Sequence, residues 1–224
     1  MPRYQHPISD IPSADEAKRL FDSLQSLEKK AQFSVLWRTG ARPTEIINLT
    51  RKDVKLAKVC KTVWRKNQVL QKCGVMNPVS LENCMKCGGA LGEAQYFIIR
   101  LPTLKLGEKE MFKVRHRELR FLRPVGMDLD PYLEMIVRYA RSLPTDDTKL
   151  FPRPVRNLER WISKKCKEVL GKPLSPYHFR HARFTLEGIR GMGVRELQQF
   201  KGAASPQSVL GYLHSKPFDI EISD

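Results

Sequence analysis

The sequence lacks the features that mark secreted and membrane-spanning proteins. No apolar run approaches the roughly eighteen residues of a transmembrane helix. The first ten residues, MPRYQHPISD, lack the apolar core of a signal peptide. The five cysteines are odd in number and have no secretory signal beside them, which argues against a disulfide framework. No repeat or low-complexity tract is visible, so we expect one or two globular domains in the cytoplasm.

Acidic residues are also scarce relative to basic ones. The 224 residues hold 40 Lys and Arg but only 24 Asp and Glu, which gives a formal net charge of +16. The basic residues are spread from end to end, which indicates a basic surface and not a basic tail. A polyanion is the expected partner, and a phosphate backbone is the commonest one. On charge alone, a soluble basic protein without a nucleic-acid role is the plainer alternative.

Periodicity and capping residues predict a mainly α fold with a small antiparallel β element, class α+β. Two strands are expected at 96–99 and 111–122, joined by a turn near Lys105. Helices are expected after Ser13, over 27–38, over 43–49, after Asp130, through 158–169, after Ser175, near 194–200 and after Ser205.

Residues 60–92 differ from the rest and are predicted to be an insertion. They hold four cysteines and paired glycines, with little helical periodicity. Cys84-Met-Lys-Cys87 resembles a zinc knuckle, because two residues between thiolates let both reach one tetrahedral ion. The matching second knuckle is incomplete, since Leu70 stands where a cysteine before Cys73 is expected. We predict a structural zinc, with a degenerate ribbon of free thiols as the alternative; the candidate ligands are Cys60, Cys73, Cys84 and Cys87.

Two arginine-bearing segments are candidates for phosphate chemistry. Thr39-Gly-Ala-Arg-Pro-Thr-Glu45 places Arg42 at the start of a short helix, where free N–H groups and the helix dipole favour an anion. A surface arginine paired with Glu45 is the alternative. Tyr177-His-Phe-Arg-His181 opens another helix, and its Tyr, Arg and second His lie off the apolar face. They either point together into a cleft or form an exposed polar face.

These segments, together with a tyrosine near the end of the sequence, resemble the tyrosine recombinase or phage-type integrase family. That family carries Thr-Gly-x-Arg-x-x-Glu early and His-x-x-Arg-His late. A Leu-Gly-His or Gly-Trp follows, with the nucleophilic tyrosine nine residues after its last residue. Here Lys201-Gly-Ala203 stands in that place, and Tyr212 follows Ala203 by nine residues. The resemblance runs from about residue 8 to residue 214, interrupted by residues 60–92.

The resemblance implies a fold, a reaction and partners. Residues 1–224 are expected to form the family's catalytic domain, without its N-terminal core-binding domain. The reaction cleaves and rejoins DNA through a 3′-phosphotyrosyl intermediate, and it requires neither a nucleotide cofactor nor a catalytic metal. Double-stranded DNA is the expected partner, bound by a self-associated tetramer.

The resemblance also assigns roles to residues. Arg42 and Arg180 match the two phosphate-binding arginines, and Tyr212 matches the nucleophile. Lys105 at the predicted hairpin turn is the candidate general acid, with Lys109 and Lys113 as rivals. Tyr177 is expected to orient the phosphate or the nucleophile. The expected supporting residues are Glu45, His181 and Ala203.

Two departures leave alternatives open. Tyr177 replaces the family's first His, and Ala203 replaces its His or Trp. A tyrosine at the first position, the Tyr212-Leu-His214 ending and a cysteine-bearing insertion look like the archaeal branch, which implies an archaeal virus or plasmid. The alternatives are a non-catalytic DNA-binding relic of a recombinase, a type IB topoisomerase-like enzyme, and a zinc-ribbon interaction module.

Overall fold

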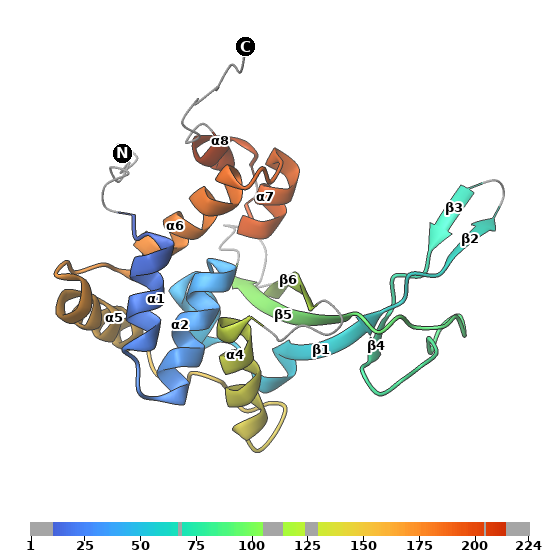
Figure 1. Cartoon of the computed structure of the whole chain (residues 1–224), viewed down its shortest axis with the longest axis horizontal. Helices are drawn as coiled ribbons and strands as arrows, with labels where there is room; N and C mark the ends of the chain where they lie inside the picture. The colour runs from blue at the N-terminus through green and yellow to red at the C-terminus, as the bar shows by residue number, and fades with distance from the viewer. Residues whose placement is uncertain (1–10, 67–68, 105–113, 124–129, 204, 214–224) are drawn as a thin grey trace, which may run out of the picture.

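A helical body and a long β arm make up the molecule (Figure 1). The computed structural model describes residues 11–66, 69–104, 114–123, 130–203 and 205–213. The α+β class is confirmed. The helices are α1 (Ala14–Asp22), α2 (Leu27–Thr39), α3 (Pro43–Ile47), α4 (Pro131–Ser142), α5 (Val155–Leu170), α6 (Pro176–Ile189), α7 (Val194–Lys201) and α8 (Gln207–Leu213).

The helix ends follow from the capping residues in the sequence. The Ser13 side chain accepts a hydrogen bond from the Glu16 backbone N–H, and the Glu16 carboxylate returns one, so a capping box opens α1. Asp130 caps α4 without a returning bond, because its carboxylate accepts hydrogen bonds from the backbone N–H groups of Tyr132 and Leu133. Gly40 and Gly171 end α2 and α5 in the left-handed conformation, which glycine adopts without steric cost.

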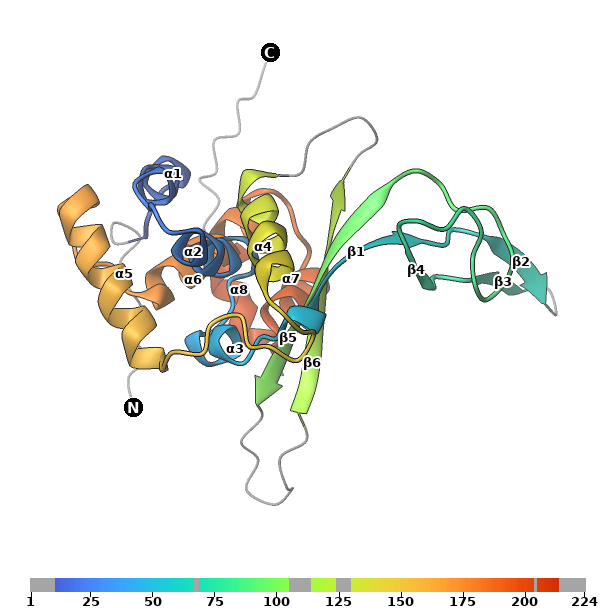
Figure 2. The same cartoon turned by 90° about the horizontal axis from the view of Figure 1, so that it is seen from below.

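Helix α2 forms the centre of the body. It contacts α1, α3, α4 and α6, which surround it in Figure 2. This enclosure explains why even Gln32 and Ser34 are buried along with its apolar residues. Phe33 on α2 meets Phe179 on α6 edge to face, with ring centroids 5.1 Å apart. This contact packs α2, at whose end the early arginine segment begins, against α6, which carries the late one.

A four-stranded antiparallel sheet lies beside the helices, in the order β4-β1-β5-β6. The two strands expected from the sequence are present: β5 is longer than the expected 96–99, and β6 overlaps the expected 111–122 from Val114 onward. Strand β1 was missed. In β1 the lysines interrupt the apolar alternation, so its pattern resembled a surface segment. The strands are β1 (Val54–Val59), β4 (Met76–Pro78), β5 (Gln95–Leu104) and β6 (Val114–Arg123).

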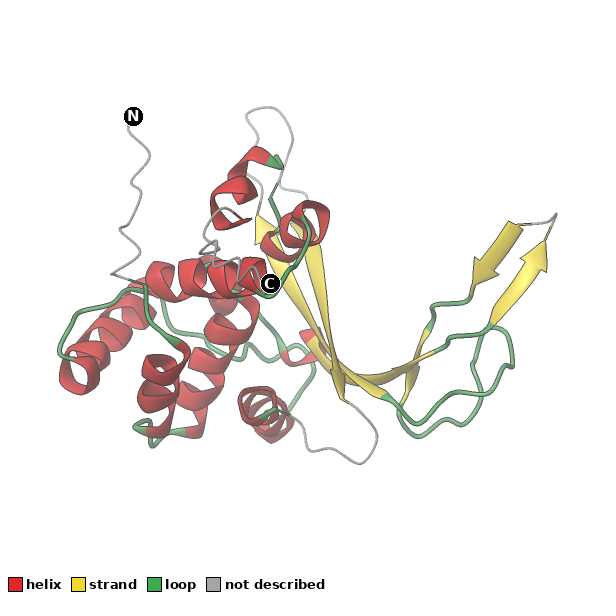
Figure 3. Cartoon of the chain, turned by 45° about the horizontal axis from the view of Figure 1, so that its top comes forward, coloured by secondary structure: helices red, strands yellow, loops and turns green. Residues whose placement is uncertain are grey.

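Residues 60–92 form an arm that extends away from the body (Figure 3). Its outer part is a separate two-stranded sheet, β2 (Val63–Lys66) paired with β3 (Val69–Lys72), called the ribbon below. The described part of this range contains strands and loops but no helix, in agreement with its lack of helical periodicity. Among the described residues, no helix is long and apolar enough to cross a membrane.

Helix α8 packs on α6 at unusually close range. A Cβ atom added to Gly188 of α6 would lie 3.1 Å from the carbonyl carbon of Tyr212 and closer still to its oxygen. Only a residue without a side chain permits this approach. Phe184, Leu197 and Val209 form a small buried cluster beneath the contact. The position of Tyr212 is thus set by backbone packing and not only by its own side chain.

Candidate active site

Arg180 is the buried centre of the candidate site. Its side chain belongs to α6 and the residue is only 5% exposed. The guanidinium donates hydrogen bonds to the backbone carbonyl of Gly40, at the end of α2, and to that of Lys201 at 3.2 Å. It also lies over the Phe184 ring, 4.6 Å from the centroid. Burial lowers the pKa of Arg180, and the charges of Arg42 and Arg117 lower it further.

Arg42 lies at the start of α3 and is paired with a buried carboxylate. Its Nη1 is 3.0 Å from Oε1 of Glu45, which is 2% exposed. The backbone N–H of Arg42 donates to the same carboxylate at 2.8 Å. The arginine side chain keeps 38% of its surface exposed. The pairing offered as the plainer alternative is therefore present, and it leaves Arg42 accessible to a ligand.

Arg117 completes this arrangement and was missed in the sequence. It is a β6 residue, 7% exposed, and its Nη2 lies 3.0 Å from Oε2 of Glu45. Its Nη1 donates to the backbone carbonyl of Phe200 at the end of α7. The available signal was its register, because Arg117 lies two residues before the buried Leu119 and therefore on the same face of the strand.

Tyr212 lies on α8 with its hydroxyl oxygen 2.8 Å from Nδ1 of His181. Its half-buried ring meets the ring of Phe184 edge to face at 5.7 Å. Burial raises the pKa of Tyr212, and the nearby positive charge of Arg180 opposes that rise. The phenol is thus protonated at neutral pH, and it already has a hydrogen-bond partner on the neighbouring helix.

Lys201 is a second site residue that sequence reasoning did not select. Its Nζ lies 4.7 Å from the centroid of the Tyr212 ring and donates to the Ser208 carbonyl at 2.6 Å. Burial, followed by the charges of Arg180 and Arg42, lowers the pKa of Lys201 to about 8. The family pattern has leucine at this position and gave Lys201 no role, because it becomes part of the site only when α7 packs against α6 and α8.

The remaining expected residues have different positions. Tyr177 is 47% exposed, one helical turn before Arg180 and His181. Ala203 is half-buried and packs against the cluster that contains Phe184, so its side chain brings no polar group. Lys105 and its rivals Lys109 and Lys113 lie outside the described residues.

The charges in this site are strongly unbalanced. Arg42, Arg117, Arg180 and Lys201 interact electrostatically, and Glu45 is the carboxylate paired within the group. Among these five groups the excess is three positive charges. Like charges placed together at partial burial are costly unless an anion compensates them. The arrangement therefore suits binding of a phosphate beside the Tyr212 hydroxyl.

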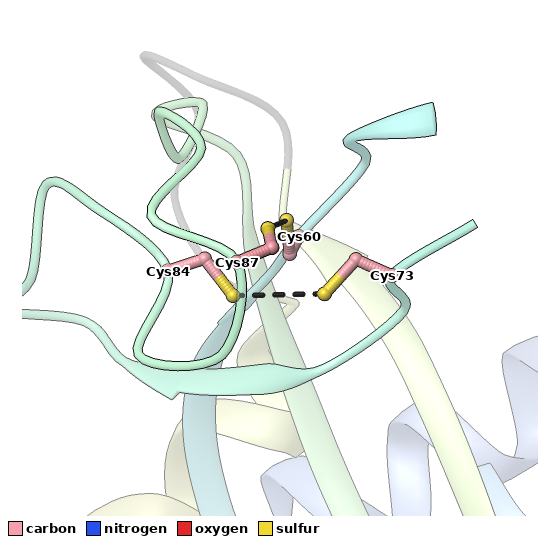
Figure 4. A group of neighbouring side chains, drawn as sticks. All are labelled: Cys60, Cys73, Cys84 and Cys87. Atoms are coloured by element: carbon pink, nitrogen blue, oxygen red, sulfur yellow. Dashed lines mark hydrogen bonds between the residues drawn. The ribbon is translucent and has the colours of Figure 1, made fainter. Parts of the chain in front are cut away.

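A second cluster lies where the arm leaves the sheet (Figure 4). The Sγ atoms of all four expected ligands lie within 4.8 Å of one another. The pairs Cys60–Cys87 and Cys73–Cys84 have Sγ atoms 3.6 Å apart. A tetrahedral zinc with Zn–S bonds of about 2.3 Å requires S–S distances of roughly 3.8 Å. The cluster thus fits one zinc ion with all four predicted ligands, including Cys60, the one most distant in sequence from Cys84 and Cys87.

The polar surroundings of Cys84 also suit a metal thiolate. Backbone N–H groups of Cys87 and Lys86 lower the pKa of the Cys84 thiol to about 6, against the opposing effect of burial. The Lys86 N–H lies 3.4 Å from its sulfur, and the Asn77 side-chain amide lies 3.7 Å away. Donors directed at sulfur stabilise the charged form that binds metal.

Comparison with solved structures decides the fold. XerA recombinase superposes with a TM-score of 0.59 at 21% sequence identity, over 96% of this chain and 62% of that one. The fold is that of the tyrosine recombinase catalytic domain. The integrase of transposon Tn1549, solved with transposon right-end DNA, gives 0.56 at 14% identity over 98% of this chain and 65% of that one.

A third tyrosine recombinase, XerH, was solved with its difH substrate before cleavage. It matches with a TM-score of 0.54 at 14% identity, over 92% of this chain and 50% of that chain. This chain thus spans less than two thirds of the length of these recombinases. No family model and no curated protein matches the sequence.

Proposed function

We propose that this chain is the catalytic domain of a tyrosine recombinase, a site-specific recombinase or integrase that cleaves and rejoins double-stranded DNA. The observation that carries the proposal is the Tyr212 hydroxyl beside a group of cations with excess positive charge. The fold supports it, since similarly folded proteins were solved with DNA. The net charge of +16 supports a DNA partner as well.

In the proposed reaction, the Tyr212 oxygen attacks the scissile phosphorus, and the bond from phosphorus to the 5′ oxygen breaks. The phenol proton passes to Nδ1 of His181, which lies within hydrogen-bond reach. The leaving 5′ oxygen takes its proton from a general acid, for which Lys105 remains the candidate. The product is a 3′-phosphotyrosyl chain and a free 5′ hydroxyl. Attack by a 5′ hydroxyl reverses these steps without ATP or a catalytic metal.

The arginines supply charge stabilisation in this scheme. Arg42 and Arg180 bind the non-bridging oxygens, whose charge develops in the transition state. Glu45 and Arg117 are positioning residues, because the shared carboxylate holds Arg42 in place. Lys201 binds a phosphate oxygen. It thereby supplies a polar contact that the side chain of Ala203 cannot make.

The exposed Tyr177 orients the bound DNA through its hydroxyl, since its side chain is accessible beside the arginine turn. We further propose self-association into a tetramer, because each chain carries one nucleophile and two duplexes contain four strands to be exchanged. The cysteine cluster binds a structural zinc ion that fixes the base of the arm.

A nicked suicide substrate tests the proposal, because loss of the short 5′ fragment traps the covalent intermediate. A pool of such duplexes with randomised sequence removes the need to know the target. The wild-type chain should give a protein–DNA band on a denaturing gel, and Tyr212→Phe should give none while still binding DNA. Tyr139→Phe is the control, since its ring stacks on Phe151 at 5.6 Å, within the body.

Formation of the adduct by Tyr212→Phe contradicts the proposal, and so does failure of the wild-type chain to form it. Absence of the adduct with retained binding would favour the non-catalytic relic. An adduct accompanied by supercoil relaxation, without recombinant product, would favour the topoisomerase-like enzyme.

A further inference from the structure

The ribbon serves no purpose in the chemistry proposed above, yet it concentrates unusual surface. Five of the eight large apolar side chains that are exposed among the described residues lie in the arm. All eight residues of β2 and β3 are exposed on both faces. A two-stranded sheet this bare gains little from burial, so its exposed groups are available to a partner. The five are Val63, Trp64, Val69, Leu70 and Met85.

The strand register distributes these residues over two mixed faces. Residues directly opposite in an antiparallel pair point to the same side. One face carries Arg65 opposite Leu70, and the other carries Lys66 opposite Val69. Trp64 lies on the second face, opposite Gln71. Each face therefore presents a cation beside an apolar group, which differs from the uniform apolar face of a protein core.

The charge of the arm favours a polyanionic partner. Residues 60–92 contain five basic side chains but only one acidic one, Glu82. An apolar patch that docks on another protein usually has charges depleted at its centre. Here the cations alternate with the apolar side chains, an arrangement that suits phosphates flanking base edges. The basic residues are Lys61, Arg65, Lys66, Lys72 and Lys86.

The shape and support of the ribbon also suit DNA. The major groove of B-DNA admits a two-stranded β ribbon. The ribbon lies at the end of the molecule opposite α5, well outside the helical body (Figures 1 and 2). Backbone pairing runs without interruption into its base, where the Cys73 N–H donates to Thr62 and the Cys60 N–H donates to Val75, both at 2.9 Å. The cysteine cluster lies at this point, and a zinc ion bound there would hold the base of the ribbon in place.

We propose that the β2–β3 ribbon inserts into the major groove of the DNA beyond the cleaved phosphate. Arg65, Lys66 and Lys72 contact phosphates, while Trp64, Val69 and Leu70 contact base edges. The inference rests on the proposed function in one respect: the ribbon and the candidate active site bind the same DNA duplex. The ribbon thus extends the bound segment of DNA and supplies sequence readout that the catalytic helices do not need to provide.

Salt dependence of binding measures the phosphate contacts. The double variant Arg65→Gln/Lys66→Gln should flatten the slope of log affinity against log salt by about 1.8, at about 0.9 for each lost phosphate contact. The matched control is Arg160→Gln/Lys164→Gln on α5, two exposed cations at the opposite end. Its slope should equal the wild-type slope. Equal slopes for the ribbon variant and the wild type would overturn the proposal.

Photo-crosslinking locates the contact directly. Benzoylphenylalanine at Leu70 should crosslink to duplex DNA on irradiation, and the same group at Lys164 should not. Both are made in the Tyr212→Phe background, so the result does not depend on covalent chemistry and its failure is distinguishable from failure of the proposed reaction. Crosslinks from position 70 to a second protein chain, or equal DNA crosslinking from both positions, would refute groove insertion.

Discussion

Replacing Gly188 with alanine perturbs the nucleophile without altering any group that touches DNA in the proposed complex. The added methyl group would lie 3.1 Å from the Tyr212 carbonyl carbon and closer to its oxygen, inside the 3.4 Å at which ordinary contact begins. The obstacle is backbone, so no flexible side chain can yield. Helix α8 must move away from α6, and Tyr212 must move with it.

The cost follows from the size of that movement. Relief of the clash requires a shift on the order of 1 Å, and misplacement of a reacting group by that amount costs roughly a hundredfold in rate. A hundredfold corresponds to about 2.7 kcal/mol of activation free energy. Alanine otherwise favours a helix interior over glycine by about 1 kcal/mol. The effect should therefore appear in catalysis and not as unfolding of the body.

The assay is single-turnover formation of the covalent adduct with the suicide substrate. DNA affinity, measured in parallel, should remain near wild type, because Arg42, Arg117 and Arg180 do not lie on α8. Gly211→Ala is the matched control, since a Cβ there meets nothing within 4 Å. A wild-type cleavage rate in Gly188→Ala, or equal losses in both variants, would refute the reasoning.

Three further predictions concern the phosphate, the leaving group and the metal. Alanine at Arg42 or Arg180 should slow cleavage roughly a hundredfold to a thousandfold, with a much smaller loss of affinity; equal losses would indicate a merely electrostatic role. Lys105→Ala should cleave a substrate with a 5′-bridging sulfur almost normally and the ordinary substrate poorly, whereas such rescue in a Lys109 or Lys113 variant would move the general acid there. Protein purified without chelator should contain about one zinc per chain by metal analysis, and a stable, metal-free arm would support the degenerate ribbon.

The sequence predicted features whose cause is local. Helix starts were found because a capping residue acts on the turn beside it, as Ser13 and Asp130 do. The cysteine cluster was predicted because closely spaced cysteines that belong to no disulfide framework usually bind a metal ion. The end of α2 is also local in cause, because Gly40 adopts the left-handed conformation there.

The missed features depend on long-range packing. Arg117 looked like one basic residue among many, and only strand pairing and the packing of α7 bring it to Glu45. Lys201 lies in a stretch that matched the recombinase pattern poorly, and its position over the Tyr212 ring depends on how α8 returns to α7. Periodicity within a single segment carries no information about contacts between segments that are distant in sequence.

The hydrogen bonds of Arg180 have a consequence for the order in which the protein matures. Its guanidinium joins the carbonyl of Gly40, 140 positions earlier, to that of Lys201, 21 positions later. During synthesis the early arginine segment leaves the ribosome long before its partners exist, and contacts of such separation form late in folding. A partly synthesised chain thus has neither the buried arginine nor the tyrosine that would cut DNA. In the proposed reaction, the capacity to cut a strand therefore arises only once α8 has been made, after the elements that carry Arg42, Arg117 and Arg180.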